Sequence, residues 1–178
     1  GNLSKAVYYQ EKPYTFQPEK YGLALAFFYY KQARFVDADI VYQKILKLNP
    51  TASTYVSYAV FLLRRHLYMD SKKYLIRTIE QKNCEEFGLS PAAKDIATPR
   101  LWEILNNNET AIIRIRDKVL AYYLLLTHHV YTQNDYRQLS QDMQNVVGFL
   151  AESAYPADKV LLSIITMQSY ASHLNGIA

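Results

Sequence analysis

Cysteine is nearly absent from this chain of 178 residues, in which Cys84 is the only one. A lone cysteine excludes an internal disulfide and a cysteine-based zinc site, although it is compatible with either redox compartment. Glycine and proline are also scarce, at 5 and 6 residues, which argues against an all-β fold with many tight turns. Apolar residues make up 50% of the chain and charged residues 20%, a balance typical of a globular protein with a substantial core.

The sequence also lacks the motifs that carry common catalytic chemistry. It has no glycine-rich phosphate loop, no GxSxG nucleophile elbow and no HExxH zinc motif. His128 and His129 are adjacent, so on a helix they point about 100° apart and cannot share a metal ion as an i, i+4 pair can. We therefore expect no catalytic residue, no metal site and no cofactor, and we predict that the protein is not an enzyme.

Long hydrophobic runs are missing as well. The most apolar stretch, residues 119–127, is short and follows Arg114, Arg116, Asp117 and Lys118, so it predicts a buried helix and no membrane span in this segment. The chain begins with GNLSK and no initiator methionine, which leads us to expect a segment of a longer or processed precursor. The compartment, cytoplasmic or extracytoplasmic, and the oligomeric state stay open.

Hydrophobic periodicity and breaker residues predict helices throughout the chain. Asn49-Pro50 ends one helix, because proline cannot continue it and disfavours the α conformation in the residue before it. Ser90-Pro91 and Thr98-Pro99 each place a capping hydroxyl before a proline at the first helical position. The predicted helices cover residues 3–10, 18–35, 37–48, 51–66, 70–82, 109–132, 134–153 and 156–174. Residues 83–108 are predicted to add one irregular helix and one short helix that carries Leu101, Trp102 and Leu105.

These elements predict an all-α fold of about eight or nine helices. An N-terminal helix and a connector over 11–18 occupy residues 1–18, and a single domain follows over 19–178. The domain is predicted to contain two hairpins (19–86), an irregular helical insert (87–108) and three C-terminal helices (109–178).

The residues along one stripe of each of two helices predict which faces are buried. They are Leu25, Phe28, Tyr29 and Gln32 on the helix 18–35, and Ile40, Val41, Ile45 and Leu48 on the helix 37–48. Asp70 or Ser71 is expected to cap the helix over 70–82. The 17 tyrosines fit the seams between helices, since the ring is buried while the hydroxyl reaches a polar partner.

Residues 19–52 carry a spaced pattern that is typical of one repeat family. The pattern is W-x2-L-G-x2-Y, then A-x3-F, then P, and it recurs every ~34 residues. The residues at its positions are Gly22, Leu25, Ala26, Tyr29, Ala38, Tyr42 and Pro50. This segment resembles a tetratricopeptide repeat, in which Ala26 and Ala38 let two helices approach closely while Tyr29 and Tyr42 fill the space beside them.

Two further registers match this pattern less well. In residues 53–86, Lys72 occupies the small-residue position and Cys84 the proline position. In a third register, which starts near Leu120, Leu139 replaces the small residue. The resemblance implies antiparallel helix hairpins stacked as a right-handed superhelix, and a generic helical bundle is the alternative.

The resemblance also implies a concave groove lined by the first helix of each hairpin, which holds a peptide or a partner helix. The groove-facing positions would be Lys20, Leu23, Phe27, Tyr30, Lys31, Thr54, Ser57, Phe61, Arg64 and Arg65. Aromatic residues beside basic ones favour a protein or peptide partner with apolar anchors and acidic character. Leu23 and Phe27 replace the Lys and Asn that family members use to clamp a C-terminal carboxylate, so that mode of binding is not expected.

A cluster of basic residues supports a second hypothesis, a nucleic-acid-associated regulatory domain. The cluster consists of Arg64, Arg65, Lys72, Lys73, Arg77 and Lys82, with Asp70 and Glu80 among them. The net charge of the whole chain is only +4, which is low for a nucleic-acid-binding protein. A solvated helix surface is therefore the favoured interpretation of residues 64–82, and phosphate binding remains the alternative.

Overall fold

The computed structural model describes residues 2–81, 90–106, 116–128, 159 and 163. Every regular element within these residues is a helix, which confirms the predicted all-α class. The helix predicted over 134–153, and all but two residues of the one predicted over 156–174, lie outside the described part. The described helices are α1 (Asn2–Phe16), α2 (Pro18–Lys31), α3 (Phe35–Leu48), α4 (Ala52–Arg64), α5 (Tyr68–Glu80), α6 (Pro91–Ile96), α7 (Pro99–Leu105) and α8 (Arg116–His128).

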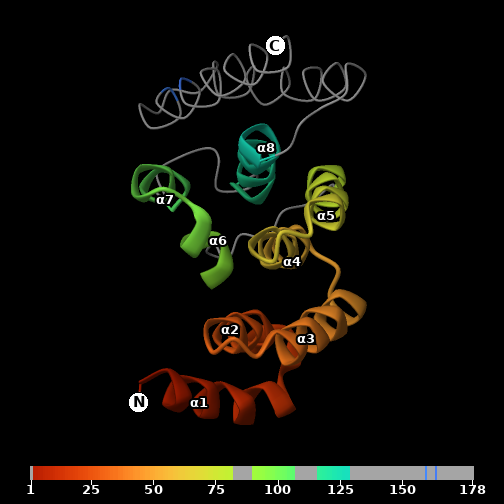
Figure 1. Ribbon diagram of the computed structural model, residues 1–178, viewed down its shortest axis with the longest axis vertical. Coiled ribbons are helices and arrows are strands. Elements are labelled where there is room, and N and C mark those ends of the chain that lie inside the picture. The colour runs from red at the N-terminus through yellow and green to blue at the C-terminus, as the bar shows by residue number, and fades with distance from the viewer. Residues whose placement is uncertain (1, 82–89, 107–115, 129–158, 160–162, 164–178) are drawn as a thin grey trace.

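The helices pack mainly against their neighbours in the sequence (Figure 1). Helices α2 and α3 form one hairpin, α4 and α5 form the next, and the two hairpins follow one another along the long axis of the molecule. Helix α1 covers α2 at one end, and α8 packs on α4 and α5 at the other. Helix α6 lies beside α2 and α4, on the side away from α3 and α5.

Helix α1 is longer than the sequence predicts. It continues through Pro13 to Phe16, so the predicted connector over 11–18 is wrong. A proline inside a helix costs roughly 3 kcal/mol, and packing against α2 offsets this cost. Tyr29 of α2 donates a hydrogen bond to Glu11 Oε1 at 2.6 Å, and Tyr14 packs against the buried residues of α2 and α3.

The turn between α2 and α3 is a Schellman motif, a common way of ending a helix. It occupies residues 32–34, where the sequence predicts that the first helix continues to residue 35. Ala33 has a φ of 58°, in the left-handed region. The amide of Ala33 donates to the carbonyl oxygen of Tyr30 (2.9 Å), and the amide of Arg34 donates to that of Tyr29 (2.9 Å). The chain therefore reverses, and α3 returns along α2.

The turn between α4 and α5 repeats this geometry. His66 has a φ of 60° and is the counterpart of Ala33. The amide of His66 donates to the carbonyl oxygen of Leu63 (3.0 Å), and the amide of Leu67 donates to that of Leu62 (2.9 Å). Each donor and each acceptor of the second turn lies the same number of residues after its counterpart in the first turn. We call the pairing of residues separated by this number of positions the turn register.

The turn register differs by one position from the pairing that the sequence pattern predicts. It matches Ala38 with Ser71, whereas the pattern matches Ala38 with Lys72. Ala59 likewise corresponds to Ala26, and Ala26, Ala38, Ala59 and Ser71 are all fully buried. Lys72 is only partly buried. The second hairpin therefore has small residues at its close helix contact, as the first does.

Ser71 is a contact between helices and not the predicted cap. Its Oγ donates a hydrogen bond to the carbonyl oxygen of Ala59 at 2.9 Å. Helix α5 begins without a side-chain cap, so the expectation that Asp70 or Ser71 caps it is wrong. The hydroxyl group instead joins α5 to α4 at the point where their backbones approach closely.

The buried face of α3 differs from the predicted one. Ile40 is 60% exposed and Leu48 is 47% exposed. The buried positions are Ala38, Val41, Tyr42 and Ile45. The small Ala38 faces α2, so the centre of the buried stripe lies between Ala38 and Tyr42, and Ile40 falls on the opposite side of the helix.

Two clusters of buried side chains form the core, and α4 contributes to both. The first joins α1 to α4 and contains Leu25, Tyr29, Tyr42, Ile45 and Phe61 among others. The second joins α4 to α8 and contains Val60, Leu75, Ala92, Leu101 and Leu120 among others. Most of the described side chains of α8 are buried, which confirms the prediction of a buried helix over 119–127.

The two hydroxyl-proline pairs begin helices as the sequence predicts. Ser90 Oγ accepts a hydrogen bond from the amide of Ala93 (3.3 Å) at the start of α6. Thr98 Oγ1 accepts one from the amide of Leu101 (3.2 Å) at the start of α7. These caps fix the position where α6 begins beside α4.

Candidate interaction groove

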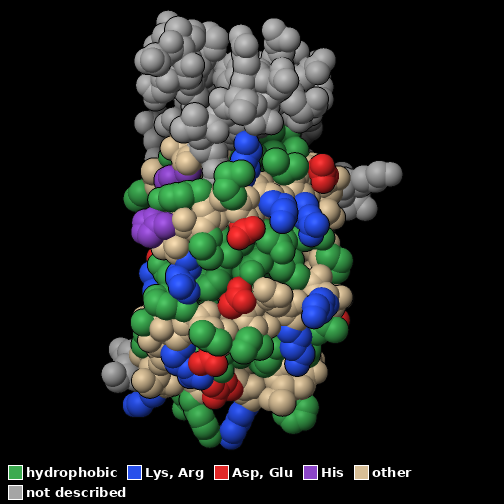
Figure 2. Space-filling view, turned by 45° about the vertical axis from the view of Figure 1, so that its right-hand side comes forward, with side chains coloured by type: hydrophobic (Ala, Val, Ile, Leu, Met, Phe, Trp, Pro, Cys, Tyr) green, Lys and Arg blue, Asp and Glu red, His purple; other side chains and the backbone are tan. Residues whose placement is uncertain are grey.

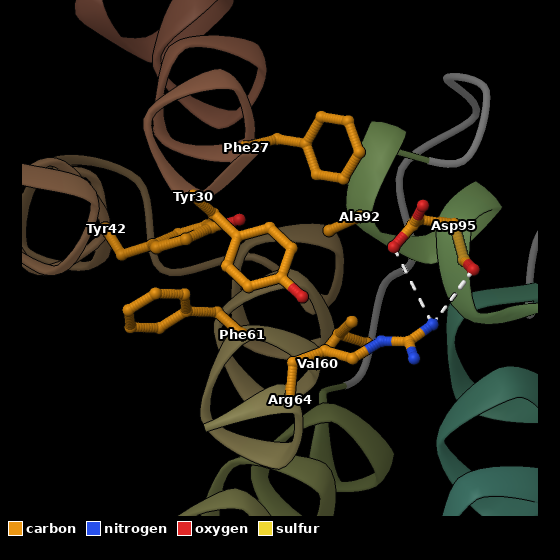
Figure 3. Close-up of a pocket in the computed structure, with 8 residues that line it drawn as sticks. All are labelled: Phe27, Tyr30, Tyr42, Val60, Phe61, Arg64, Ala92 and Asp95. Atoms are coloured by element: carbon orange, nitrogen blue, oxygen red, sulfur yellow. Dashed lines mark hydrogen bonds and ion pairs between the residues drawn. The ribbon is translucent and has the colours of Figure 1, made fainter. Parts of the chain in front are cut away.

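Helices α2, α4 and α6 meet around a small pocket (Figure 3). Its lining residues are Phe27 and Tyr30 from α2, Tyr42 from α3, Val60, Phe61 and Arg64 from α4, and Ala92 and Asp95 from α6. We define the α2/α4 groove as the surface that α2 and α4 present to α6, formed by Phe27, Tyr30, Lys31, Val60 and Arg64. In the turn register, Val60 is the counterpart of Phe27, and Arg64 is the counterpart of Lys31. Equivalent positions of the two hairpins therefore form this surface.

Two cations from different hairpins converge on one carboxylate. Lys31 Nζ lies 2.6 Å from Asp95 Oδ1, and Arg64 Nη2 lies 3.6 Å from Asp95 Oδ2. Arg64 Nη2 also donates a hydrogen bond to the carbonyl oxygen of Asp95 at 3.1 Å. All three side chains are between one quarter and two fifths exposed, so the charges remain partly hydrated.

Aromatic rings form the wall of the groove on the α2 side. The ring centroids of Phe27 and Tyr30 lie 6.3 Å apart, and Tyr30 makes an edge contact with Phe61 at 6.2 Å. Lys31 Nζ lies 5.2 Å from the centroid of Phe27 and 5.8 Å from that of Tyr30. The ammonium group is thus flanked by ring faces and by a carboxylate, a setting that favours a cation.

Three of the residues predicted to face the groove, Thr54, Ser57 and Phe61, are buried in the structure. Phe61 is 4% exposed and packs against Tyr42 at a centroid distance of 5.2 Å. Thr54 Oγ1 donates to the carbonyl oxygen of Asn49 (2.9 Å). Ser57 Oγ donates to a carbonyl oxygen of its own helix and lies 2.6 Å from Ser90 Oγ of α6. In the turn register Phe61 is the counterpart of Phe28 and Val60 is the counterpart of Phe27, and both Phe61 and Val60 line the pocket.

The other predicted residues lie at the edges of this surface. Lys20 is exposed, with its Nζ 5.2 Å from the ring centroid of Tyr21. Leu23 is partly buried against the first core cluster. The guanidinium carbon of Arg65 lies 4.2 Å from the ring centroid of Phe35, away from Asp95. Of the ten predicted positions, Phe27, Tyr30, Phe61 and Arg64 line the pocket, Lys31 pairs with Asp95 beside it, and Ser57 contacts the start of α6.

Three residues of this site were not predicted from the sequence. Val60 was missed because of the one-position error in the repeat register. Ala92 and Asp95 belong to the segment that the sequence predicts only as an irregular insert. Asp95 is 64 residues from Lys31 in the chain, so no local pattern indicates their contact.

The tyrosines beside the groove are neutral packing residues. Burial and the hydrogen bond to Glu11 raise the pKa of Tyr29 to about 12. Burial and a 2.8 Å hydrogen bond from Tyr58 OH to Asp39 Oδ1 raise the pKa of Tyr58 above its ordinary value. Burial alone is the main cause of the raised pKa of Tyr42. These hydroxyl groups therefore stay protonated at neutral pH, and those of Tyr29 and Tyr58 join helices to one another.

The basic cluster of residues 64–82 is spread over different contacts. Arg64 pairs with Asp95, Arg65 lies over Phe35, and Arg77 lies over the ring of Tyr74 at 5.5 Å. On the face shown in Figure 2, basic side chains are scattered among acidic and hydrophobic ones. Lys82 lies outside the described residues, and phosphate binding by this cluster stays a prediction.

Within the part of the chain that the structure describes, no group of three or more histidine, cysteine or acidic side chains is arranged to hold a metal ion. No helix in that part is both long enough and apolar enough to cross a bilayer. Comparisons with protein-family models, curated proteins and solved structures find nothing that matches this chain.

Proposed function

We propose that this chain is a protein–protein interaction domain whose α2/α4 groove binds a partner segment with an acidic side chain. It serves as the scaffold, adaptor or sensor portion of a larger regulator or assembly, and it has no catalytic activity of its own. The observation that carries this proposal is the convergence of Lys31 and Arg64 on one carboxylate beside aromatic rings.

The charges of Lys31 and Arg64 and the aromatic wall together favour a peptide-like ligand. A carboxylate between two partly exposed cations gains charge-assisted hydrogen bonds at a modest desolvation cost. Phe27 and Tyr30 add apolar surface next to these cations, and rigid aromatic side chains are common anchors at protein interfaces. An acidic peptide or helix with a neighbouring apolar side chain fits this combination.

The arrangement of the hairpins supports a tetratricopeptide-like fold for this domain. The offset between the equivalent turn residues Ala33 and His66 is close to the repeat length of that family. Small residues also lie at the close helix contact of both hairpins. In such arrays the first helices of successive repeats form the ligand surface. Helices α2 and α4 hold that position here, and we propose that the stack is a right-handed superhelix.

A display selection tests the proposed function. The bait is the full chain with Asp95→Ala, which removes the carboxylate already held by Lys31 and Arg64, and the library is a phage display of random nine-residue peptides. We expect peptides enriched in Asp or Glu, because only an anionic side chain can pair with both cations. Each enriched peptide is then titrated against the same bait with Lys31→Glu and Arg64→Glu added.

The matched control carries Lys47→Glu and Lys73→Glu, which make the same change in charge at exposed positions on α3 and α5. Binding should be lost with the groove variant and retained with the control. Selected peptides without acidic residues, or equal loss of binding in both variants, would show that the groove does not recognise an acidic partner.

A further inference from the structure

Helix α6 lies in the α2/α4 groove and buries little apolar surface there. Its buried apolar side chains are only Ala92 and Ala93, the smallest that carry a Cβ. Ile96 is partly buried against the second core cluster. By contrast, α4 buries eleven of its thirteen side chains. Little apolar surface therefore holds α6 in place.

Polar contacts fasten both ends of this segment. At its start, Ser90 Oγ lies 2.6 Å from the buried Ser57 Oγ of α4. At its end, Asp95 pairs with Lys31 of α2 and with Arg64 of α4. The segment thus meets the groove with small apolar residues and one carboxylate. This is the chemistry that the proposed function assigns to the partner.

The groove has no room for a second ligand while α6 is present. The cavity that remains among the groove, Ala92 and Asp95 has a volume of about 10 Å³, which is the lower limit for one water molecule. Figure 3 shows Arg64 extended toward Asp95 and both rings of α2 turned toward α6. An external peptide must displace α6 before its carboxylate can take the place of Asp95 between Lys31 and Arg64.

We propose that residues 90–97 are an intramolecular ligand that keeps the α2/α4 groove closed until a partner segment of the same chemistry replaces them. This inference rests on the proposed function and adds a way in which binding to the groove is regulated. The partner segment carries a carboxylate three positions after a small apolar side chain, as Asp95 follows Ala92. Such positions lie on the same face of a helix, so both groups meet the groove together.

The closed state lowers the apparent affinity for any external ligand. A tethered segment competes at an effective concentration that reaches the millimolar range for short flexible linkers. The apparent dissociation constant rises in inverse proportion to the open fraction. If α6 is in place in about nine molecules of ten, opening the groove tightens binding about tenfold.

A reversible disulfide tests this competition within one protein. The full chain carries Ser57→Cys and Ser90→Cys in a Cys84→Ser background, because the two hydroxyl groups lie 2.6 Å apart and a disulfide needs closely placed Cβ atoms. The probe is a fluorescein-labelled peptide of residues 90–97, SPAAKDIA, with blocked ends. Fluorescence anisotropy follows its binding before and after reduction with dithiothreitol.

We expect no binding by the oxidised protein, recovered binding after reduction, and binding at least about tenfold tighter by an Asp95→Ala variant of the natural chain. A control peptide with Asn in place of Asp95 should bind more weakly in each case. If the oxidised and reduced proteins bind the peptide with equal affinity, α6 does not compete for the groove, and the proposed function is unaffected. No binding of SPAAKDIA to the reduced protein or to Asp95→Ala would show that this segment is not a ligand. The display selection decides the proposed function separately.

Discussion

Replacing Ala33 by glycine should stabilise the protein, although glycine usually weakens a helical protein. Ala33 has a φ of 58° at the Schellman turn after α2. An L-residue in the left-handed region costs roughly 1–2 kcal/mol, and glycine avoids this cost. Glycine also loses more conformational freedom on folding, which costs roughly 0.5–1 kcal/mol. Since Ala33 is exposed and loses no buried contact, the difference predicts a gain of about 0.5–1 kcal/mol.

The same substitution inside α2 provides the matched control. Ala24→Gly removes the same methyl group from a residue with helical φ, and it should lower the free energy of unfolding by about 1 kcal/mol. Urea unfolding followed by circular dichroism at 222 nm should therefore move the two midpoints in opposite directions, each by a few tenths of a molar. If Ala33→Gly lowers the midpoint as Ala24→Gly does, residue 33 is not left-handed and the equivalence of the two turns is wrong.

The other predictions concern the core and the titrating groups. Phe61→Ala should lower the free energy of unfolding, measured in urea, by about 3–5 kcal/mol, because this ring is a core residue. A decrease of less than about 1 kcal/mol would place the Phe61 ring at the surface. Gly22→Ala should lose about 1 kcal/mol, since a Cβ there would collide with Ile45 Cδ1 and overpacking outweighs the gain in helix propensity. Ile45→Val removes Cδ1 and should reduce the loss, and an unchanged loss contradicts the contact. Stability should fall as the pH rises above 10, because Tyr29 then ionises in the unfolded chain while its pKa in the folded protein is about 12. The fall in stability should be shallower in Tyr29→Phe, and an equal fall in both proteins would contradict the role of Tyr29. Partial desolvation and the charge of Arg64 lower the pKa of His128, so the unfolded chain binds a proton more readily and stability should fall as the pH drops through about 6.5. His128→Gln should make this dependence shallower, and an unaltered dependence assigns it to other groups.

The features that sequence predicts best here are local ones. Thr98 and Ser90 cap α7 and α6 as expected, because a cap depends on a hydroxyl and an amide three positions apart. The pattern predicts Ala26 and Ala38 as packing residues of one hairpin, and both are fully buried. In each case the information lies within a short stretch of chain.

The features that sequence missed depend on distant contacts or on register. The helix through Pro13 persists because α2 packs against it, and no residue near Pro13 signals that contact. A register error of one position rotates a helical residue by about 100°, so the position on α4 that corresponds to Phe27 is Val60 and not Phe61, which lines the pocket as part of the first core cluster. The ion pair of Asp95 with Lys31 likewise joins residues that lie 64 positions apart in the chain.

The pairing of Asp95 with both hairpins also has a mechanical consequence. Lys31 is the last residue of α2 and Arg64 the last of α4, so a carboxylate held by both cations spans the joint between the two hairpins. Bending the stack at this joint changes the distance between the cations and weakens one of the two ion pairs. By thermodynamic linkage, a carboxylate in the groove then increases the bending stiffness of the stack, and a force that bends the stack weakens the hold on the carboxylate.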